Sequence, residues 1–379
     1  MIYLTYNDPP SGIYSSQVID VCSFLNSKMN TKMRLVSLIS LRNFWANKNI
    51  IKSEIPSAII LPMFPKLQNW KWNYLSLFIL FIFLGRDSVI ARGPFAASLA
   101  LGLKKIKMVK FVCFDARGAY HAELSEYNVT ESKTIINDIF SLEQNCVLKS
   151  DFRIAVSEKL VGYWKEKLGY DKMAHAVVPC TVNPEKFTQI INEEFNERQK
   201  LQLGFSKDDI IFVYSGSSAG WQSFHTLDDF LCNLLKQNQY YKVLFLIDKL
   251  PQNLKLLKMH PGKIKAKNVS KEEVGPILVC CDYGLLIREE SITNQVASPV
   301  KFAEYLAAGL KVLISENIGD YSDFVINHQC GYVVNLLTEH KVFLKISPKE
   351  RRGCINIANK YFLRSGYLNE YKKLLNSIS

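Results

Sequence analysis

The chain has 379 residues, more than a single hydrophobic core usually supports, so we expect two domains. Of these residues 48% are hydrophobic and 22% charged, a composition that excludes an intrinsically disordered protein. Its 47 Lys and Arg against 35 Asp and Glu give a net charge of +12, which favours anionic partners. No finger spacing, aromatic-basic strand signature or basic arm occurs, so we expect no nucleic-acid binding. The 9 cysteines lack Cys-x-x-Cys spacing, so we expect neither a disulfide framework nor a zinc site.

In the first half of the chain, strand-like apolar runs alternate with segments of helical length, such as residues 15–28, 94–105 and 133–149. This order predicts a parallel, doubly wound sheet. The first strand lacks the charged start and long apolar run of a signal peptide, which predicts a cytoplasmic protein. The expected strands are residues 2–6, 33–39, 58–63, 88–91, 108–114 and 152–156.

Residues 73–84 form an unusually apolar run, NYLSLFILFIFL, flanked by Lys66, Lys71 and Arg86. The run is too short to span a bilayer. One interpretation is a core helix that is hydrophobic on all sides. The other is a helix partly inserted at the inner face of the cell membrane, with Trp70 and Trp72 at the level of the lipid headgroups.

A polar, acidic stretch with Pro179 and Pro184 precedes a second alternating region and marks the predicted domain boundary. We expect an N-terminal domain over residues 1–187, a C-terminal domain over 196–350 and a helical tail over 351–379 that crosses back to the first domain. The predicted fold class is α/β, with two tandem doubly wound, Rossmann-like parallel-sheet domains that face each other across a cleft. The strands expected in the second domain are residues 210–214, 242–247, 263–269, 283–287, 312–315 and 332–335.

A glycine-bearing turn follows the first strand of each domain. Gly12 could let the backbone approach a ligand at a helix start, although many α/β proteins have a Gly-Ser turn there for steric reasons only. The turn of the second domain lacks the spacing of dinucleotide folds and P-loops. Its small residues Gly216 and Ser217 leave room for a diphosphate, and Trp221 is either a cover for a base or sugar or plain core packing.

A third turn carries four polar side chains, namely Asp115, Arg117, His121 and Glu123. They follow a buried strand on the expected cleft side of the first domain. There they could orient an acceptor hydroxyl or the sugar of a donor, and Asp115 could accept a proton. The competing interpretation is a local ion-pair network that shapes the loop.

The most informative segment begins at Ser298 and reads SPVKFAEYLAAG. Lys301 and Glu304 share one face of its expected helix, which connects two buried strands, and Arg288 ends the run before it. Such helix starts bind phosphates in open α/β sheets, so Lys301 would meet a diphosphate while Glu304 accepts from sugar hydroxyls. The alternative is an ordinary surface ion pair.

The chain contains no Asp-x-Asp, no His-Glu-x-x-His and no nucleophile elbow, so we expect no metal and no other cofactor. The charge on a leaving group would then be met by Lys301 and Arg288 together with helix dipoles.

These residues resemble a known family. The segments 283–288, 298–310 and 317–320 look like the donor half of GT-B glycosyltransferases, specifically the bacterial enzymes of glycosyltransferase family 4 that build surface polysaccharides. The turn 214–217 with Trp221-Gln222 matches a branch of that family, and so do the pairs 156–157, 178–179 and 183–184.

The resemblance implies a hexosyltransferase that moves a sugar from a nucleotide sugar to a hydroxyl of a lipid-linked oligosaccharide, without a metal and with retention of configuration. Glu304 would bind the ribose of the donor. Arg288, Lys301 and the amides after Gly216 would hold the diphosphate, and Ser298 would belong to the same donor site. The turn at Asp115, Arg117 and Gly118 would face the acceptor and the transferred sugar, which makes Asp115, Arg117 and Lys301 the candidate catalytic residues.

The chain departs from the family pattern at several positions. Val296 occupies the place of a second glutamate, Ser217, Ser218 and Trp221-Gln222 stand where many members have an Arg and a Lys, and the usual acceptor-side histidine is not at Asp115. Two alternatives therefore stay open: a sugar-nucleotide 2-epimerase that neither hydrolyses the donor nor uses an oxidised cofactor, and a non-catalytic nucleotide-sugar-binding protein.

Overall fold

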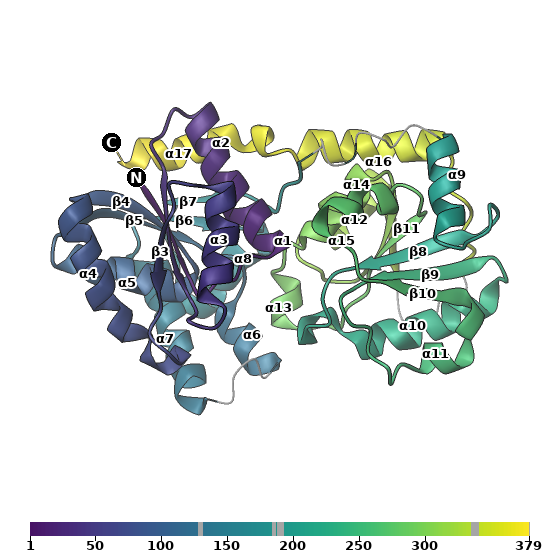
Figure 1. The fold of residues 1–379 in the computed structure, drawn as a ribbon, viewed down its shortest axis with the longest axis horizontal. Helices are drawn as coiled ribbons and strands as arrows, with labels where there is room; N and C mark the ends of the chain where they lie inside the picture. Colours follow the sequence, from purple (N-terminus) through teal and green to yellow (C-terminus); the bar gives the residue numbers. More distant parts are fainter. Residues whose placement is uncertain (128–131, 184–186, 188–192, 335–340, 379) are drawn as a thin grey trace. The chain divides into compact units, whose positions relative to one another are not determined.

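The computed structural model of the chain describes residues 1–127, 132–183, 187, 193–334 and 341–378 (Figure 1). The chain divides into two compact units. Unit 1 contains Met1–Pro179 and Tyr367–Ser379, and unit 2 contains Cys180–Gly366. The last helix, α17 (Leu368–Ile378), therefore belongs to unit 1, whereas the helix before it, α16 (Pro348–Tyr361), belongs to unit 2.

Unit 1 is built on a sheet of 7 parallel strands in the order β3-β2-β1-β4-β5-β6-β7. The strands are β1 (Ile2–Tyr6), β2 (Arg34–Ile39), β3 (Ile59–Pro62), β4 (Asp87–Arg92), β5 (Val109–Asp115), β6 (Phe152–Ala155) and β7 (His175–Val177). The helical segments between them are α1 (Gly12–Tyr14), η1 (Ser15–Ile19), α2 (Asp20–Lys28), α3 (Phe44–Glu54), η2 (Leu67–Trp72), α4 (Asn73–Leu84), α5 (Gly93–Lys105), α6 (Tyr120–Glu126), α7 (Lys133–Lys149) and α8 (Glu158–Leu168).

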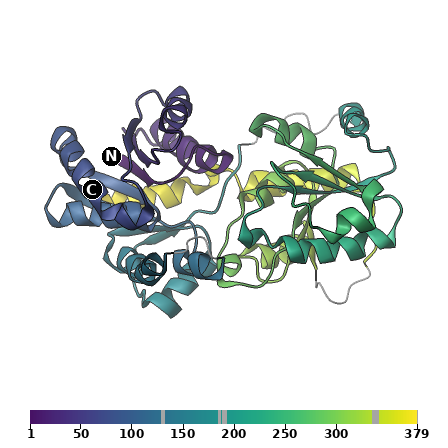
Figure 2. The same ribbon diagram turned by 60° about the horizontal axis from the view of Figure 1, so that its bottom comes forward.

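The inner strands of unit 1 read as nearly continuous apolar runs because helices cover both faces of the sheet (Figures 1 and 2). All five residues of β1 are buried. Tyr371 and Leu374 of α17 pack into the same core as Tyr3 and Leu25, so the C-terminal helix is part of this unit.

Unit 2 is built on a sheet of 6 parallel strands in the order β10-β9-β8-β11-β12-β13. The strands are β8 (Ile210–Ser215), β9 (Tyr241–Leu246), β10 (Ile264–Lys267), β11 (Tyr283–Leu286), β12 (Lys311–Ser315) and β13 (Gly331–Val334). Besides α16, the helical segments are α9 (Glu193–Gln202), η4 (Gly220–Gln222), α10 (Phe224–Gln237), α11 (Lys255–Met259), η5 (Pro261–Lys263), α12 (Lys271–Leu278), α13 (Ile292–Gln295), α14 (Val300–Ala307) and α15 (Tyr321–His328). The segment η6 (Arg364–Tyr367) spans the point at which the chain passes from unit 2 to unit 1.

The predicted α/β class with two parallel, Rossmann-like sheets is confirmed. Each expected strand overlaps a strand of the structure, and only the end of the last one, at residue 335, lies outside the described residues. Strand β7 was not predicted; it has 3 residues and, among the described strands, hydrogen bonds only to β6. A strand this short at a sheet edge carries almost no periodic signal.

Helix α4 occupies the residues expected from its apolar run, but it is not buried on all sides. Only Asn73, Leu77 and Phe81 are buried, whereas Leu75, Ile79, Ile82 and Phe83 are exposed. The expectation of a core helix is therefore wrong for one of its faces. Within the described part of the chain, no helix is both long and apolar enough to cross a membrane.

Candidate functional site

The candidate site of unit 2 lies at the carboxyl ends of neighbouring parallel strands, the edge where open α/β sheets bind ligands. Gly216 directly follows β8, Arg288 follows β11 and Ser315 ends β12. The Arg288 backbone N–H donates to the Ser315 hydroxyl at 2.8 Å, which fixes the loop after β11 to the next strand. Helix α14 brings Lys301 to this edge in its first turn.

Two buried cations converge there on one amide oxygen. Lys301 Nζ donates to Gln222 Oε1 at 3.0 Å, and Arg288 Nη2 donates to the same oxygen at 3.1 Å. The other terminal nitrogen of Arg288 donates to Asn294 Oδ1 at 3.1 Å. Lys301, Arg288 and Gln222 are 7%, 5% and 8% exposed. Two positive charges thus share a neutral acceptor at a nearly dry site.

The charge of Lys301 is disfavoured in this environment. Burial lowers the pKa of Lys301 well below its ordinary value, and the neighbouring Arg288 guanidinium lowers it further. The Glu304 carboxylate acts in the opposite direction without outweighing them. The ammonium also lies 4.0 Å from the centroid of the Tyr214 ring, whose negative face attracts a cation. An anion bound here would stabilise the charged lysine.

The absence of a side chain at Gly216 lets Lys301 Nζ lie close to the backbone of this turn. A Cβ atom at this position would lie 2.8 Å from Lys301 Nζ and 3.4 Å from the Tyr214 hydroxyl oxygen. Its φ of +150° is also a conformation that side chains rarely adopt. The turn is held by the Tyr214 hydroxyl, which donates to the backbone oxygen of Ser217 at 2.6 Å.

The other residues of unit 2 that were expected to bind the donor differ in how exposed they are. Glu304 is partly exposed on α14, and Trp221 is half-buried. Ser217 is exposed. Ser298 is buried, and its hydroxyl lies 2.7 Å from the Tyr321 hydroxyl. The same hydroxyl accepts a hydrogen bond from the Cys180 backbone N–H at 3.0 Å, so Ser298 anchors the segment before α14.

Three residues that build this centre were not predicted to belong to it. Gln222 joins the two cations, Asn294 orients Arg288, and Tyr214 underlies Lys301. Asn294 is fully buried and also donates to the backbone oxygen of Glu289 at 3.1 Å. In the sequence, Trp221-Gln222 stands where many members of the family that the chain resembles have basic residues, but no role was predicted for Gln222 itself. Val296, at the position of the family's second glutamate, is buried and apolar.

In unit 1, Asp115 ends β5 and is the centre of a buried polar cluster at the carboxyl edge of that sheet. It accepts a hydrogen bond from the Tyr3 hydroxyl, and Arg117 Nη1 lies 3.3 Å from its Oδ1. Arg92, at the end of β4, lies 3.9 Å from its Oδ2 and donates to Asp8 at 2.8 Å. Arg117 also donates to Gln17. Asp115 and Arg117 are therefore brought together as expected, with Tyr3, Gln17 and Arg92 as partners that the sequence analysis missed.

His121 and Glu123 belong to a second group, which faces α7. The backbone N–H groups of Tyr120 and His121 donate to the two carboxylate oxygens of Glu143 at 3.2 and 2.9 Å. Glu143 is fully buried, and burial raises its pKa to about 7. Burial also raises the pKa of Glu123. The His121 ring packs edge-on against Phe140 with 5.3 Å between centroids.

Gly12 begins α1 and is exposed. A Cβ atom built there meets no other atom within 4 Å, so nothing in the structure requires glycine at this position. The Ser11 hydroxyl beside it accepts from the Tyr14 backbone N–H at 3.2 Å and caps the helix start.

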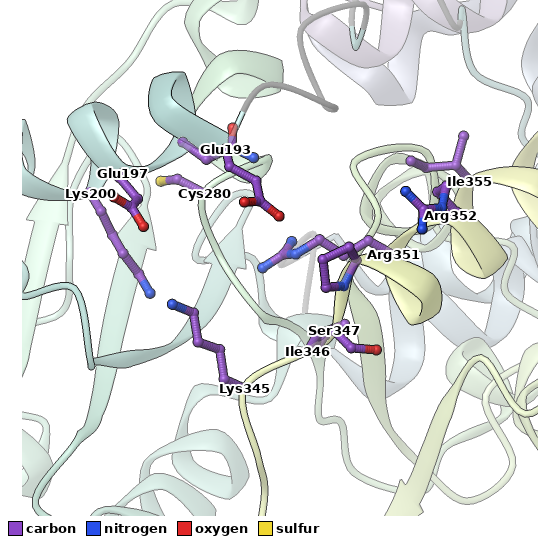
Figure 3. A pocket seen from close by; sticks show the side chains of 12 residues that line it. Glu193, Glu197, Lys200, Cys280, Lys345, Ile346, Ser347, Arg351, Arg352 and Ile355 are labelled. Atoms are coloured by element: carbon purple, nitrogen blue, oxygen red, sulfur yellow. The ribbon is translucent and has the colours of Figure 1, made fainter.

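A cavity of about 400 Å³ lies at the opposite, amino edge of the unit 2 sheet, between α9 and the start of α16 (Figure 3). Two of the cations that line it already have partners. Lys200 Nζ donates to the Asp209 backbone oxygen at 2.6 Å, and Arg351 donates to the Asp282 carboxylate at 2.9 Å. The cavity is thus separate from the Lys301 centre, and its charges hold α9 and α16 on the sheet.

No protein-family model matches the sequence, and no curated protein matches it. Solved structures do match along the whole chain. Sucrose-phosphate synthase from Thermosynechococcus elongatus has a TM-score of 0.69 at 10% identity, covering 100% of this chain and 99% of that one. Anabaena HepE in complex with UDP and glucose has a TM-score of 0.68 at 13% identity, covering 100% of both chains.

A third match is WaaG, a glycosyltransferase involved in lipopolysaccharide biosynthesis, with a TM-score of 0.67 at 11% identity and coverage of 99% of both chains. At such identities the likeness shows the fold alone. The two parallel-sheet domains of this chain have the fold of GT-B glycosyltransferases.

Proposed function

We propose that this chain is a glycosyltransferase that binds the diphosphate of a nucleotide sugar at Lys301 and Arg288. The observation that carries the proposal is the convergence of these two buried cations on the Gln222 oxygen, at 3.0 and 3.1 Å. The likeness to GT-B folds supports it, because Anabaena HepE, which shares the fold, is described in complex with UDP-glucose.

A diphosphate fits this centre for an electrostatic reason. Two cations that share one neutral oxygen repel each other, and burial leaves little water to screen them. A phosphate oxygen could replace the Gln222 oxygen as acceptor and bring a negative charge. The backbone at Gly216, which Lys301 approaches closely, and the start of α14 would then present backbone amides to the same group. These cations would stabilise the leaving diphosphate without a metal.

Glu304 would bind the ribose hydroxyls of the donor. It follows Lys301 by one turn on α14 and is partly exposed, so its carboxylate could accept from a ligand while the lysine holds the diphosphate. Trp221, which is half-buried next to Gln222, would cover the base or the sugar.

The acceptor would be a hydroxyl of a lipid-linked glycan, with Asp115 and Arg117 of unit 1 on the acceptor side and transfer with retention of configuration. The polar cluster around Asp115 supports this placement. Gln17 Nε2 and Arg92 Nη1 are buried there without a hydrogen-bond partner among the described residues, so the cluster has donors that a hydroxyl could satisfy. With a lipid-linked acceptor, transfer would take place at the cytoplasmic face of the membrane.

The first experiment is a thermal-shift screen with nucleoside diphosphates and nucleotide sugars, using Lys301→Met and a matched control, Lys311→Met. Lys311 lies in the same unit at the start of β12 and pairs with Glu350 at 2.6 Å. In Lys301→Met we expect the ligand-induced rise in Tm to be lost, since a charged hydrogen bond contributes about 1.5–3 kcal/mol. Without ligand, the Tm of Lys301→Met should equal or exceed that of wild type, because the substitution removes the disfavoured buried charge of Lys301.

Lys311→Met should keep the ligand-induced shift. A wild-type protein that no diphosphate stabilises, or a Lys301→Met protein that is stabilised as well as wild type, would contradict the proposed donor site. Transfer to a lipid extract then distinguishes the functions. An epimerised donor formed without acceptor would identify a 2-epimerase, and binding without turnover would identify a binding protein.

A further inference from the structure

Helix α4 presents a large apolar face to solvent. Its inward face consists of Asn73, Leu77 and Phe81, which are buried. On the other side, Leu75, Ile79, Ile82 and Phe83 are 59%, 47%, 57% and 82% exposed. The spacing of these four residues places them on one side of a helix. Figure 1 shows α4 on the outside of unit 1, beside α5.

Aromatic residues extend this face beyond the start of the helix. Trp72 precedes Leu75 by three residues and is 63% exposed. Its ring stacks on that of Phe64, with 6.0 Å between centroids. Trp70, which the membrane interpretation of the sequence placed with Trp72 at the level of the lipid headgroups, is instead buried against Phe95 at 5.7 Å. We call the exposed residues Phe64, Trp72, Leu75, Ile79, Ile82 and Phe83 the α4 face.

The α4 face is flanked by positive charge and carries no negative charge. Lys66 and Lys71 precede the helix and Arg86 follows it, and all three are exposed. Residues 64–86 contain no Asp or Glu. The next acidic residue, Asp87, pairs with the N-terminal amino group at 2.8 Å. Helix α5 packs beside α4, and the Tyr74 hydroxyl of α4 donates a hydrogen bond to the Gly102 backbone oxygen of α5 at 3.1 Å. Two further basic residues, Lys105 and Lys107, lie at the end of α5.

We propose that the α4 face docks on the surface of an anionic phospholipid bilayer, with the helix lying in the plane of the interface. A face of large aliphatic and aromatic side chains between basic ends is the pattern of interfacial helices. The lysines and arginine would meet the lipid phosphates while the apolar side chains enter the acyl boundary. Helix α4 has 12 residues, which is too few to cross the hydrocarbon core. The proposal does not depend on sugar transfer.

The test is co-flotation of the full chain with vesicles of phosphatidylcholine, with and without phosphatidylglycerol. The disrupting variant is Ile79→Glu/Phe83→Glu. Its matched control is Ile50→Glu/Met173→Glu, because Ile50 and Met173 are 47% and 83% exposed elsewhere on unit 1. A charge-removing variant, Lys71→Gln/Arg86→Gln, tests the electrostatic part separately.

Wild type and the control should float with anionic vesicles, and the disrupting variant should bind them at least about tenfold more weakly. The charge-removing variant should lose most of its preference for phosphatidylglycerol and its sensitivity to salt. The tryptophan emission of wild type should shift to the blue on binding, and Trp72→Phe should remove that shift. Melting curves confirm that each variant is folded.

The proposal is overturned if wild type does not float or if the disrupting variant floats as well as the control. It is also overturned if wild type is a dimer in solution that the disrupting variant converts to a monomer, because the α4 face would then be covered by a second copy of the chain. None of these outcomes depends on donor binding at Lys301, so failure here leaves the proposed function to its own test.

Discussion

At the scale of single residues, the two units differ in how their buried charged side chains are arranged. In unit 1, Asp115 and Asp8 compensate Arg92 and Arg117, so the cluster is internally paired. In unit 2, Lys301 and Arg288 share an amide oxygen, and burial together with Arg288 lowers the pKa of Lys301. Two buried cations that converge on one neutral oxygen are suited to receive an anion.

Glu143 makes the stability of unit 1 depend on pH. Burial raises its pKa from 4.5 to about 7, while the Tyr120 and His121 N–H groups lower it. Between these two values the native state holds a proton that the unfolded chain has lost, so stability falls as pH rises through this range. The loss is on the order of 3 kcal/mol. We expect Glu143→Gln to lack this pH-dependent component.

Thermal melts at pH values below and above this window measure the effect. The control is Glu126→Gln, since Glu126 is exposed on the neighbouring helix, α6. The control should keep the wild-type difference in Tm between acidic and neutral pH. If Glu143→Gln keeps the same difference, the carboxylate does not titrate in this range.

At the scale of elements, the turn after β8 decides whether Lys301 can meet a ligand. In Gly216→Ala the new Cβ would lie 2.8 Å from Lys301 Nζ, at a φ that disfavours a side chain. We expect the affinity for the nucleoside diphosphate found in the thermal-shift screen to fall about tenfold, because the ammonium must move. Isothermal titration calorimetry measures this.

Gly12→Ala is the matched control, because its Cβ would meet no atom within 4 Å. Gly12 was expected to bind the donor, so the pair of variants also tests that expectation. If both variants lose affinity equally, Gly12 also contributes to donor binding. If neither variant loses affinity, the Gly216 turn does not belong to the donor site.

The fold could be predicted to a large extent because buried parallel strands are long apolar runs, such as β8 and β11, whose residues are all buried. The same pattern indicates where strands end and helices begin, which is why Arg288 and Lys301 could be predicted to lie at one edge of the sheet. The role of Gln222 was not predictable. It depends on the left-handed conformation of Ser223 and on how η4 turns toward α14, and neither leaves a periodic signal.

Helix α4 shows another limit of sequence reasoning. Its bounds were predicted, but its inward face was not, because a helix that is apolar at nearly every position has no periodicity to mark one side. Only the packing of Leu77 and Phe81 distinguishes the buried face from the exposed one.

At the scale of the whole molecule, the residues that form the Lys301 centre all belong to unit 2, while the polar cluster around Asp115 belongs to unit 1. Each unit has its own sheet and its own core. A ligand that binds the Lys301 centre should therefore stabilise one unit directly, and the two sites can be examined separately in the intact chain.

Hydrogen exchange of the full chain locates the donor site without a transfer assay. On addition of the nucleoside diphosphate, we expect slower exchange in residues 214–223 and 288–304, since ligand contacts suppress local opening of the turn after β8 and of the start of α14. Residues 3–12 and 115–126 should exchange at unchanged rates, and Lys301→Met should show no protection. Protection confined to unit 1, or to α9 and the start of α16, would place the diphosphate elsewhere and contradict the assignment of Lys301 and Arg288.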